Sequence, residues 1–246
     1  MVRTRAGRTL AVAAASTLLL ATAPAAMATQ STIRGSISPN KGKPGTALAL
    51  SVGFTIKREN NENNTLSKVV LSFPRNATVN GAKFPSCKPE QINATRSFSS
   101  CPKGSKIGSG SLRADVPAVP VSNVPGIVTL FNGPGGKSIT VNIVAHNPVE
   151  IFEAFKAPLK KVGGRYGYVL TAPIPTTLQE INDGWFAQVT SFQTKVKATW
   201  RNLPYIAAKK CPAGGRAPIA GAFTFSPGGE IPASASTTAT SFITCK

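Results

Sequence analysis

The sequence has little negative charge and almost no histidine. Its 246 residues include nine Asp or Glu and a single histidine, His146, against 28 Lys or Arg. This leaves few side chains for the acid–base pairs and metal-ligand clusters of hydrolases and metalloproteins. Beyond residue 28, no segment approaches the roughly 20 apolar residues that a membrane-spanning helix needs, so we expect no membrane span in the mature chain.

Residues 1–28 have the pattern of a secretory signal peptide. Three arginines (Arg3, Arg5 and Arg8) precede an apolar run over residues 10–26, and Ala26-Met27-Ala28 provides the small residues of a cleavage site. A retained membrane anchor is the alternative, but the run has only about 17 residues where a span needs about 20. We therefore expect a secreted protein, extracellular or associated with the cell wall, whose mature chain is 29–246.

The mature chain is strongly basic. Three of the 28 basic residues and none of the acids precede the expected cleavage point, which leaves a net charge of +16. Such an excess favours polyanions, although it also serves solubility alone. The candidate polyanion contacts form two groups in the sequence: Lys195, Lys197 and Arg201, and Lys156, Lys160, Lys161 and Arg165.

The four cysteines predict two disulfides. Cys87, Cys101, Cys211 and Cys245 allow three pairings. We favour Cys87–Cys101 with Cys211–Cys245, which closes the two shortest loops. Zinc is the rival interpretation, but a C-x-x-C knuckle is absent and one histidine is too few, so no metal or other cofactor is predicted.

The dominant pattern is alternation of apolar and polar residues. It runs through residues 48–56, 69–73, 139–143, 192–200 and 239–245, and predicts half-buried strands. The 132–136 segment, Asn-Gly-Pro-Gly-Gly, predicts a hairpin between strands at 126–131 and 138–145. Helical turns are expected only within 149–161 and 176–181.

These strands and the frequent Gly and Pro turns predict an all-β fold. We expect an antiparallel, jelly-roll-like β-sandwich over residues 29–246. Two immunoglobulin-like sandwiches, divided near 117–125, are the alternative. The Cys…Trp…Cys pattern of immunoglobulin domains is absent, which weakens that alternative.

We find no catalytic signature, and we predict no enzyme. The 132–138 segment is followed by a strand, whereas a phosphate loop needs a helix. His146 is expected at the surface. The acid pairs Glu150 with Glu153 and Glu180 with Asp183 are spaced three residues apart, which does not suit opposite walls of a glycosidase cleft.

Aromatic residues offer a weak alternative site, a carbohydrate-stacking platform. Its candidates are Trp185, Trp200, Tyr166, Tyr168 and Tyr205. Trp200 alternates in phase with Phe192 and Val196, so we expect it in the core. Trp185 follows an Asp-Gly turn and is the better candidate for an exposed ring.

Two cysteine-containing segments resemble a family of secreted, disulfide-containing all-β proteins from actinobacteria. They are 84–110, with Cys87, Cys101-Pro102 and Ile107-Gly108-Ser109-Gly110, and 205–245, with Cys211-Pro212 and Cys245. The resemblance covers about Ile33 to Cys245. It implies the fold and secretion, and it transfers no activity and no functional residue.

Three function classes follow from the sequence. The first is a non-enzymatic envelope or extracellular protein that binds an anionic wall polymer or a glycan, without specific nucleic-acid binding. The second is a structural or partner-binding β-sandwich. The third is a hydrolase whose site has no recognised pattern. A basic face, an exposed apolar patch and a cleft with two converging acids would distinguish them.

Overall fold

The chain folds as an all-β structure, as predicted. The computed structural model describes residues 29–58, 64–119, 121–227 and 236–246, so the expected signal peptide lies outside the described residues. Eleven strands form one sheet in which every pairing is antiparallel. In sheet order they are β1 (Gln30–Ser38), β2 (Ala49–Lys57), β12 (Gln188–Val196), β5 (Lys106–Val116), β6 (Val121–Asn132), β7 (Ser138–Ala145), β8 (Ile151–Lys161), β9 (Tyr166–Pro173), β3 (Asn64–Pro74), β16 (Arg216–Pro227) and β17 (Ser236–Thr244).

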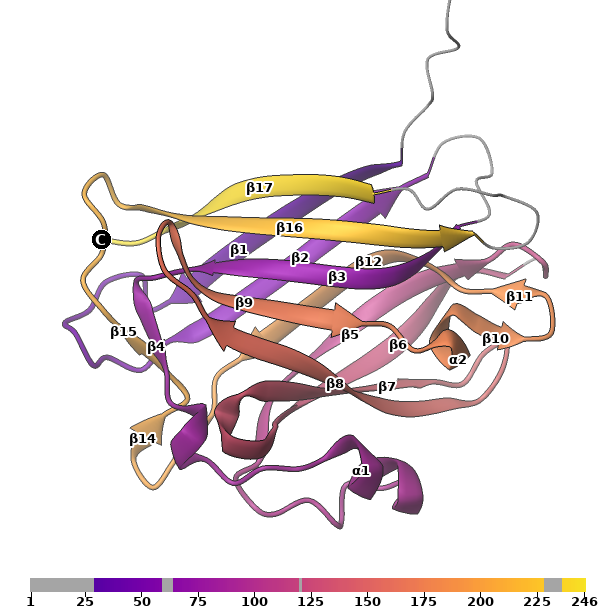
Figure 1. The fold of residues 1–246 in the computed structure, drawn as a ribbon, viewed down its shortest axis with the longest axis horizontal. Helices are drawn as coiled ribbons and strands as arrows, with labels where there is room; N and C mark the ends of the chain where they lie inside the picture. The colour runs from indigo at the N-terminus through magenta and orange to yellow at the C-terminus, as the bar shows by residue number, and fades with distance from the viewer. Residues whose placement is uncertain (1–28, 59–63, 120, 228–235) are drawn as a thin grey trace, which may run out of the picture.

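The sheet bends into a flattened, nearly closed barrel. In Figure 1, β17, β16, β3 and β9 form a front layer, and β1, β2, β12 and β5 cross behind it. The layers are joined where residues 159–161 of β8 pair with residues 168–170 of β9. On the other side the edge strands β1 and β17 lie adjacent without a backbone ladder, and Thr237 Oγ1 donates to Ser31 Oγ over 2.8 Å. The two layers expected of a sandwich are therefore present, as parts of one sheet.

The alternation in the sequence places apolar side chains inside this barrel. Val52, Phe54 and Ile56 of β2 are buried, while the residues between them are more exposed. At the seam between the edge strands a side chain at Gly35 would displace its neighbours, because a Cβ there would lie 2.8 Å from Ile243 Cγ1. This glycine lets β1 approach β16 and β17 closely.

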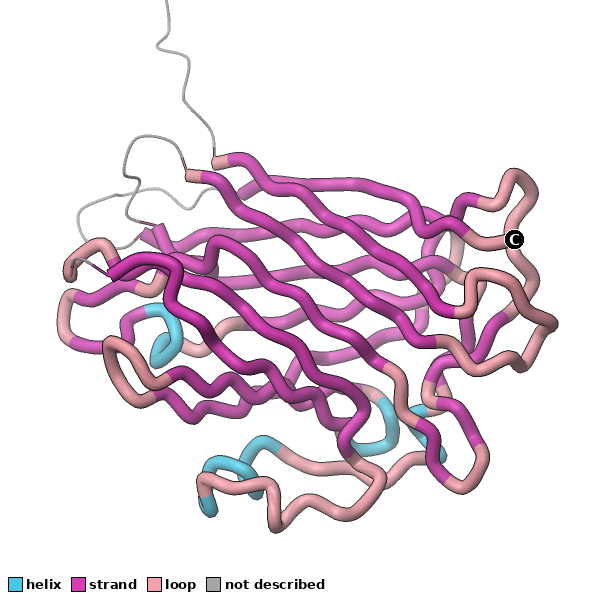
Figure 2. Tube along the Cα trace, turned by 180° about the vertical axis from the view of Figure 1, so that it is seen from behind, coloured by secondary structure: helices cyan, strands magenta, loops and turns pink. Residues whose placement is uncertain are grey.

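Short elements complete the two ends and one side of the barrel. Figure 2 shows them around the long strands. They are β4 (Ala77–Val79), β10 (Glu180–Asn182), β11 (Trp185–Phe186), β13 (Thr199–Trp200), β14 (Leu203–Pro204), β15 (Ile206–Ala208), the helices α1 (Pro89–Thr95) and α2 (Thr176–Gln179), and the 3-10 turns η1 (Gly81–Lys83) and η2 (Pro134–Gly136). No described helix has the length and apolarity to cross a membrane.

Two expected helical segments and one expected strand can be compared with the described elements. The helical turns expected within 149–161 are absent and that prediction is wrong: residues 151–161 are β8, where Phe155, Ala157 and Leu159 alternate into the interior. The helical turn in 176–181 is confirmed as α2. The strand predicted over 192–200 ends at Val196, and Thr199 and Trp200 belong to the separate β13.

Both disulfides have the predicted pairing. Cys87–Cys101 closes the segment that carries α1, which packs on the outside of β8 through Asn93. The Asn93 amide donates to the Ala154 carbonyl at 2.9 Å and accepts from its N–H at 2.8 Å. Cys211–Cys245 ties the chain after β15 to the end of β17. Residues 117–125, the division expected for two immunoglobulin-like sandwiches, lie between and at the start of paired strands: they contain the turn from β5 to β6 and the first residues of β6.

Candidate functional site

The barrel encloses an apolar cavity of about 230 Å³. This exceeds the roughly 150 Å³ at which an engineered apolar cavity takes up benzene. Its wall is formed by inward-facing residues of most strands of the barrel. They include Leu50, Val52, Leu71, Phe73, Leu112, Ala114, Val141, Ile143, Phe155, Leu170, Ala172 and Phe192.

The cavity exists because only one side of the barrel interior is filled. Beneath β1, β16 and β17, the Phe54 ring stacks on Phe192 at 5.1 Å between centroids and tilts against Phe223 at 4.9 Å. Ile219 and Phe223 are fully buried in this packed side and do not line the cavity. Away from this packed side, the small side chains of Ala114 on β5 and Ala172 on β9 line the space between the two layers.

Charged side chains reach the cavity wall at one end only. Lys41, Lys209 and Lys246 are part of the lining, together with Asn40 and Asn76, and the described lining contains no Asp, Glu or His. We call these three lysines the basic mouth. All three are exposed. The ion pair between His146 and Glu150 lies elsewhere, and no described Asp or Glu side chain forms an ion pair with these three lysines.

Hydrogen bonds and a disulfide hold the basic mouth in place. β4 and β15 pair across this end of the barrel, and their residues Val79 and Ile206 face the cavity. The loop before β2 is fixed by the bond from Ala208 N–H to Thr46 O at 2.8 Å. Lys246 N–H donates to Asn40 O at 2.7 Å, next to the Cys211–Cys245 bridge.

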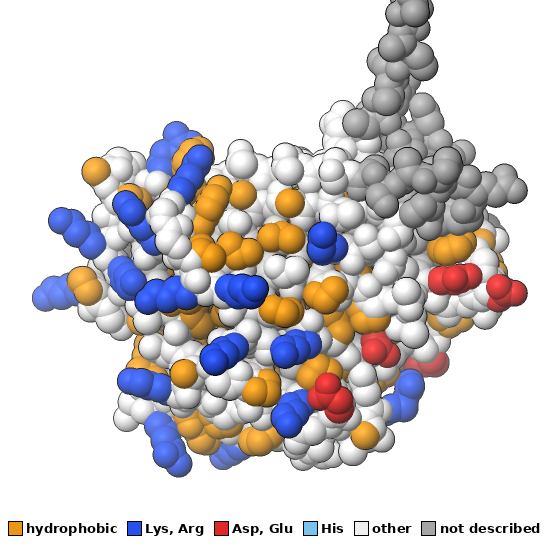
Figure 3. All heavy atoms as spheres, in the orientation of Figure 1, with side chains coloured by type: hydrophobic (Ala, Val, Ile, Leu, Met, Phe, Trp, Pro, Cys, Tyr) orange, Lys and Arg blue, Asp and Glu red, His pale blue; other side chains and the backbone are white. Residues whose placement is uncertain are grey.

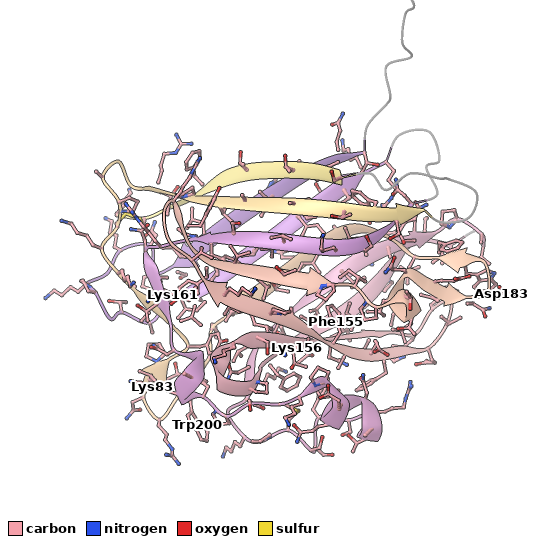
Figure 4. The ribbon with its side chains drawn as sticks, in the orientation of Figure 1. Lys83, Phe155, Lys156, Lys161, Asp183 and Trp200 are labelled. Atoms are coloured by element: carbon pink, nitrogen blue, oxygen red, sulfur yellow. A yellow bond between two sulfur atoms is a disulfide. The ribbon has the colours of Figure 1, made fainter. Side chains whose placement is uncertain are left out.

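Charge is segregated along the barrel. Because all pairings are antiparallel, the strand registers fix which loops meet at each end. The end with the basic mouth also carries Lys43, Arg75, Lys161, Arg165, Lys210 and Arg216. Of the six described carboxylates, Asp115, Glu150, Glu153, Glu180 and Asp183 lie toward the opposite end, and Glu90 is on α1. Figure 3 shows this separation of blue and red, and Figure 4 labels Lys161 and Asp183 at the two ends.

The predicted polyanion contacts lie on two walls rather than one. Lys195 is exposed on β12, Lys197 is exposed directly after it, and Lys156, Lys160 and Lys161 are exposed on β8. Three strands, β5, β6 and β7, separate β12 from β8 in the sheet. Arg201 follows β13, and Arg165 lies in the β8–β9 turn. The sheet therefore does not join the two groups into one continuous surface, although both extend toward the basic end.

The histidine and the acids considered as catalytic candidates contact neighbouring structural groups and do not converge on a cleft. His146 Nδ1 lies 2.8 Å from a Glu150 oxygen, and both side chains are 67% exposed. Glu153 accepts from Asn93 Nδ2 at 3.3 Å, and Glu180 accepts from Gly184 N–H at 2.9 Å. The described residues hold no cluster of three His, Cys, Asp or Glu that would suit a metal. The 132–138 segment is a turn followed by β7, as expected.

The aromatic candidates do not share an exposed face. Tyr205 is buried, and Tyr168 lines the cavity, where its hydroxyl accepts from Val79 N–H at 3.2 Å. Trp200 is half-buried and packs against the core, as predicted. Trp185 in β11 is half-buried rather than fully exposed.

Comparison with protein-family models, curated proteins and solved structures gave no match. The assignment of a site therefore depends on geometry. Sequence reasoning did not identify Lys41, Lys209 and Lys246 as a group, because they are up to 205 positions apart in the chain. The sequence does place each of these lysines close to the end of a strand. The strand order is needed to show that these strand ends lie at the same end of the barrel.

Proposed function

We propose that this chain is a secreted, non-enzymatic binding protein that holds the apolar part of a ligand inside its barrel. The observation that carries the proposal is the continuous apolar lining of the 230 Å³ cavity. Ligand sites in proteins are concave and mostly apolar, with a few polar groups at defined places. Here the charged groups of the described lining are confined to one end, and most of the other lining residues are apolar. Two disulfides are compatible with an oxidising, extracellular environment.

Burial of hydrocarbon supplies the affinity in this proposal. Each buried methylene contributes about 0.8 kcal/mol, so a chain of about ten gains roughly 8 kcal/mol before the costs of association. Those costs are at least about 4 kcal/mol for lost motional freedom, so a ligand with about ten buried methylenes is expected to bind with a Kd of about 1 mM.

Filling the cavity tests the proposal. Ala172 lines the cavity, and Ala172→Phe adds a ring inside the barrel; its neighbour Thr171, which does not line it, gives the matched variant Thr171→Phe. Titration calorimetry with 1-dodecanol should show binding to the parent and to Thr171→Phe, and at least about tenfold weaker binding to Ala172→Phe. Circular dichroism checks that both variants fold. Absence of dodecanol binding to the folded parent, or equal binding to all three, would contradict the proposal.

The charge segregation favours a second candidate function, association of the basic end with an anionic polymer such as a wall polymer. The basic end carries the three lysines of the basic mouth and the six further Lys and Arg residues named above. The described Asp and Glu side chains lie on α1 or toward the far end. Counterion release would then drive binding, which makes it sensitive to salt. This function needs no cavity, so the two candidates are separable by experiment.

A further inference from the structure

We infer that the cavity ligand is a single-chain anionic amphiphile, with its hydrocarbon in the barrel and its acidic headgroup at the basic mouth. The inference depends on the proposed function, and it adds the chemical class of the ligand. The headgroup chemistry is an anionic carboxylate or phosphate oxygen beside Lys41 and Lys209.

Charge is unevenly distributed over the cavity wall. A neutral apolar ligand would require no charged residue in the lining, yet three lysines belong to it and all lie at one end. Lysine ammonium groups act as compact point charges toward carboxylates and phosphates. No Asp or Glu side chain belongs to the described lining, so the ammonium groups of these lysines are open to an anionic ligand.

The two ends of the barrel differ in charge. Around the mouth the nearby cations Lys43, Lys210 and Arg216 add to the positive potential, whereas Asp115 and Asp183 lie toward the other end. This field attracts an anion to the mouth and disfavours a cation there. It therefore also sets the orientation, because at the far end the carboxylates offset the cations that lie there, such as Lys57 and Arg113.

The volume of the cavity limits the number of hydrocarbon chains that a ligand can place in it. The cavity of about 230 Å³ lies just below the roughly 300–1,000 Å³ of pockets that enclose drug-sized ligands. One hydrocarbon chain suits this space, and a two-chain lipid does not. The packed side of the barrel, with Phe54 against Phe192 and Phe223, leaves no room for a second chain without repacking.

Four probes of equal chain length test the inference by calorimetry at low ionic strength and below micelle formation: dodecanoate, dodecyl phosphate, 1-dodecanol and dodecyltrimethylammonium. For the parent protein we expect the two anions to bind about tenfold more tightly than the alcohol, and the cation to bind most weakly. The two anions distinguish a carboxylate from a phosphate headgroup.

Removing charge from the mouth supplies the second arm. The double variant Lys41→Gln/Lys209→Gln should lose the preference for anions while retaining dodecanol binding. The matched control Lys57→Gln/Lys68→Gln removes two exposed charges that do not line the cavity, and it should keep the preference.

The outcomes separate this inference from the proposed function. If no probe binds the folded parent, the proposed function fails. If dodecanol binds as tightly as the anions, or if the mouth variant keeps the preference for anions, the ligand class is wrong while the cavity still binds hydrocarbon. Tightest binding of dodecyltrimethylammonium would also overturn the inference, because it would place the headgroup near the carboxylates.

Discussion

A single buried amide, that of Asn132, organises the connection between the barrel and its outer loops. Asn132 is fully buried at the end of β6, and its Nδ2 lies 3.0–3.2 Å from the carbonyl oxygens of Gly81, Phe84 and Pro85. Its Oδ1 accepts from the Tyr205 hydroxyl at 3.2 Å. Burial raises the pKa of that hydroxyl well above its usual value, so Tyr205 remains a neutral donor.

Replacing this amide by an apolar side chain should be costly. Asn132→Leu leaves buried carbonyls and the Tyr205 hydroxyl without their partner, so the free energy of unfolding should fall by about 3 kcal/mol. Asn142→Leu is the matched control, because Asn142 is equally buried but has one 3.3 Å bond and an Oδ1 with no partner among the described residues. Its loss should be about 1 kcal/mol or less. Denaturant unfolding measures both, and equal losses would contradict the role of Asn132.

At the scale of elements, the strands were predictable and their closure was not. Alternation in β2 and β3 identifies half-buried strands, because one face of each must be apolar. β7 alternates in sequence as well, although residues 138–142 are buried on both faces. The same alternation fits a packed sandwich and a hollow barrel, since both bury the same face. Helical turns were predicted within 149–161, where the chain forms β8, because this strand is set by its pairing with β7.

The Cys211–Cys245 bridge stabilises the C-terminal strand as well as the mouth. The double variant Cys211→Ser/Cys245→Ser opens a loop with a sequence separation of 34 and should lower the free energy of unfolding by about 4 kcal/mol in the chain-entropy model. The separation of 14 in Cys87–Cys101 predicts about 3 kcal/mol for the corresponding pair of substitutions.

Proteolysis gives an independent measurement of the same bridge. Carboxypeptidase should trim the last eight residues rapidly in the Cys211→Ser/Cys245→Ser variant and slowly in the oxidised parent, because the bridge restrains fraying of β17. Equal trimming rates would show that the β16–β17 pairing alone holds this strand.

For the whole molecule, charge segregation predicts how it meets an anionic surface. The parent should sediment with purified cell walls at low salt and be released at high salt. Lys209→Gln/Lys210→Gln at the basic end should weaken this association more than Lys57→Gln/Lys68→Gln does. Binding that persists in high salt, or equal effects of the two variants, would argue against electrostatic capture through the basic end.

Apolar ligand binding inside the barrel is the central claim, and methyl-resolved NMR tests it most directly. On titration with 1-dodecanol, the methyl groups of Leu71, Val141 and Leu170, which line the cavity, should shift and show intermolecular NOEs to the alkyl chain. The methyl groups of Ile127, which is 57% exposed on the outer face, should not. NOEs to Ile127 in place of the lining residues, or no NOE to any lining methyl group, would contradict the account.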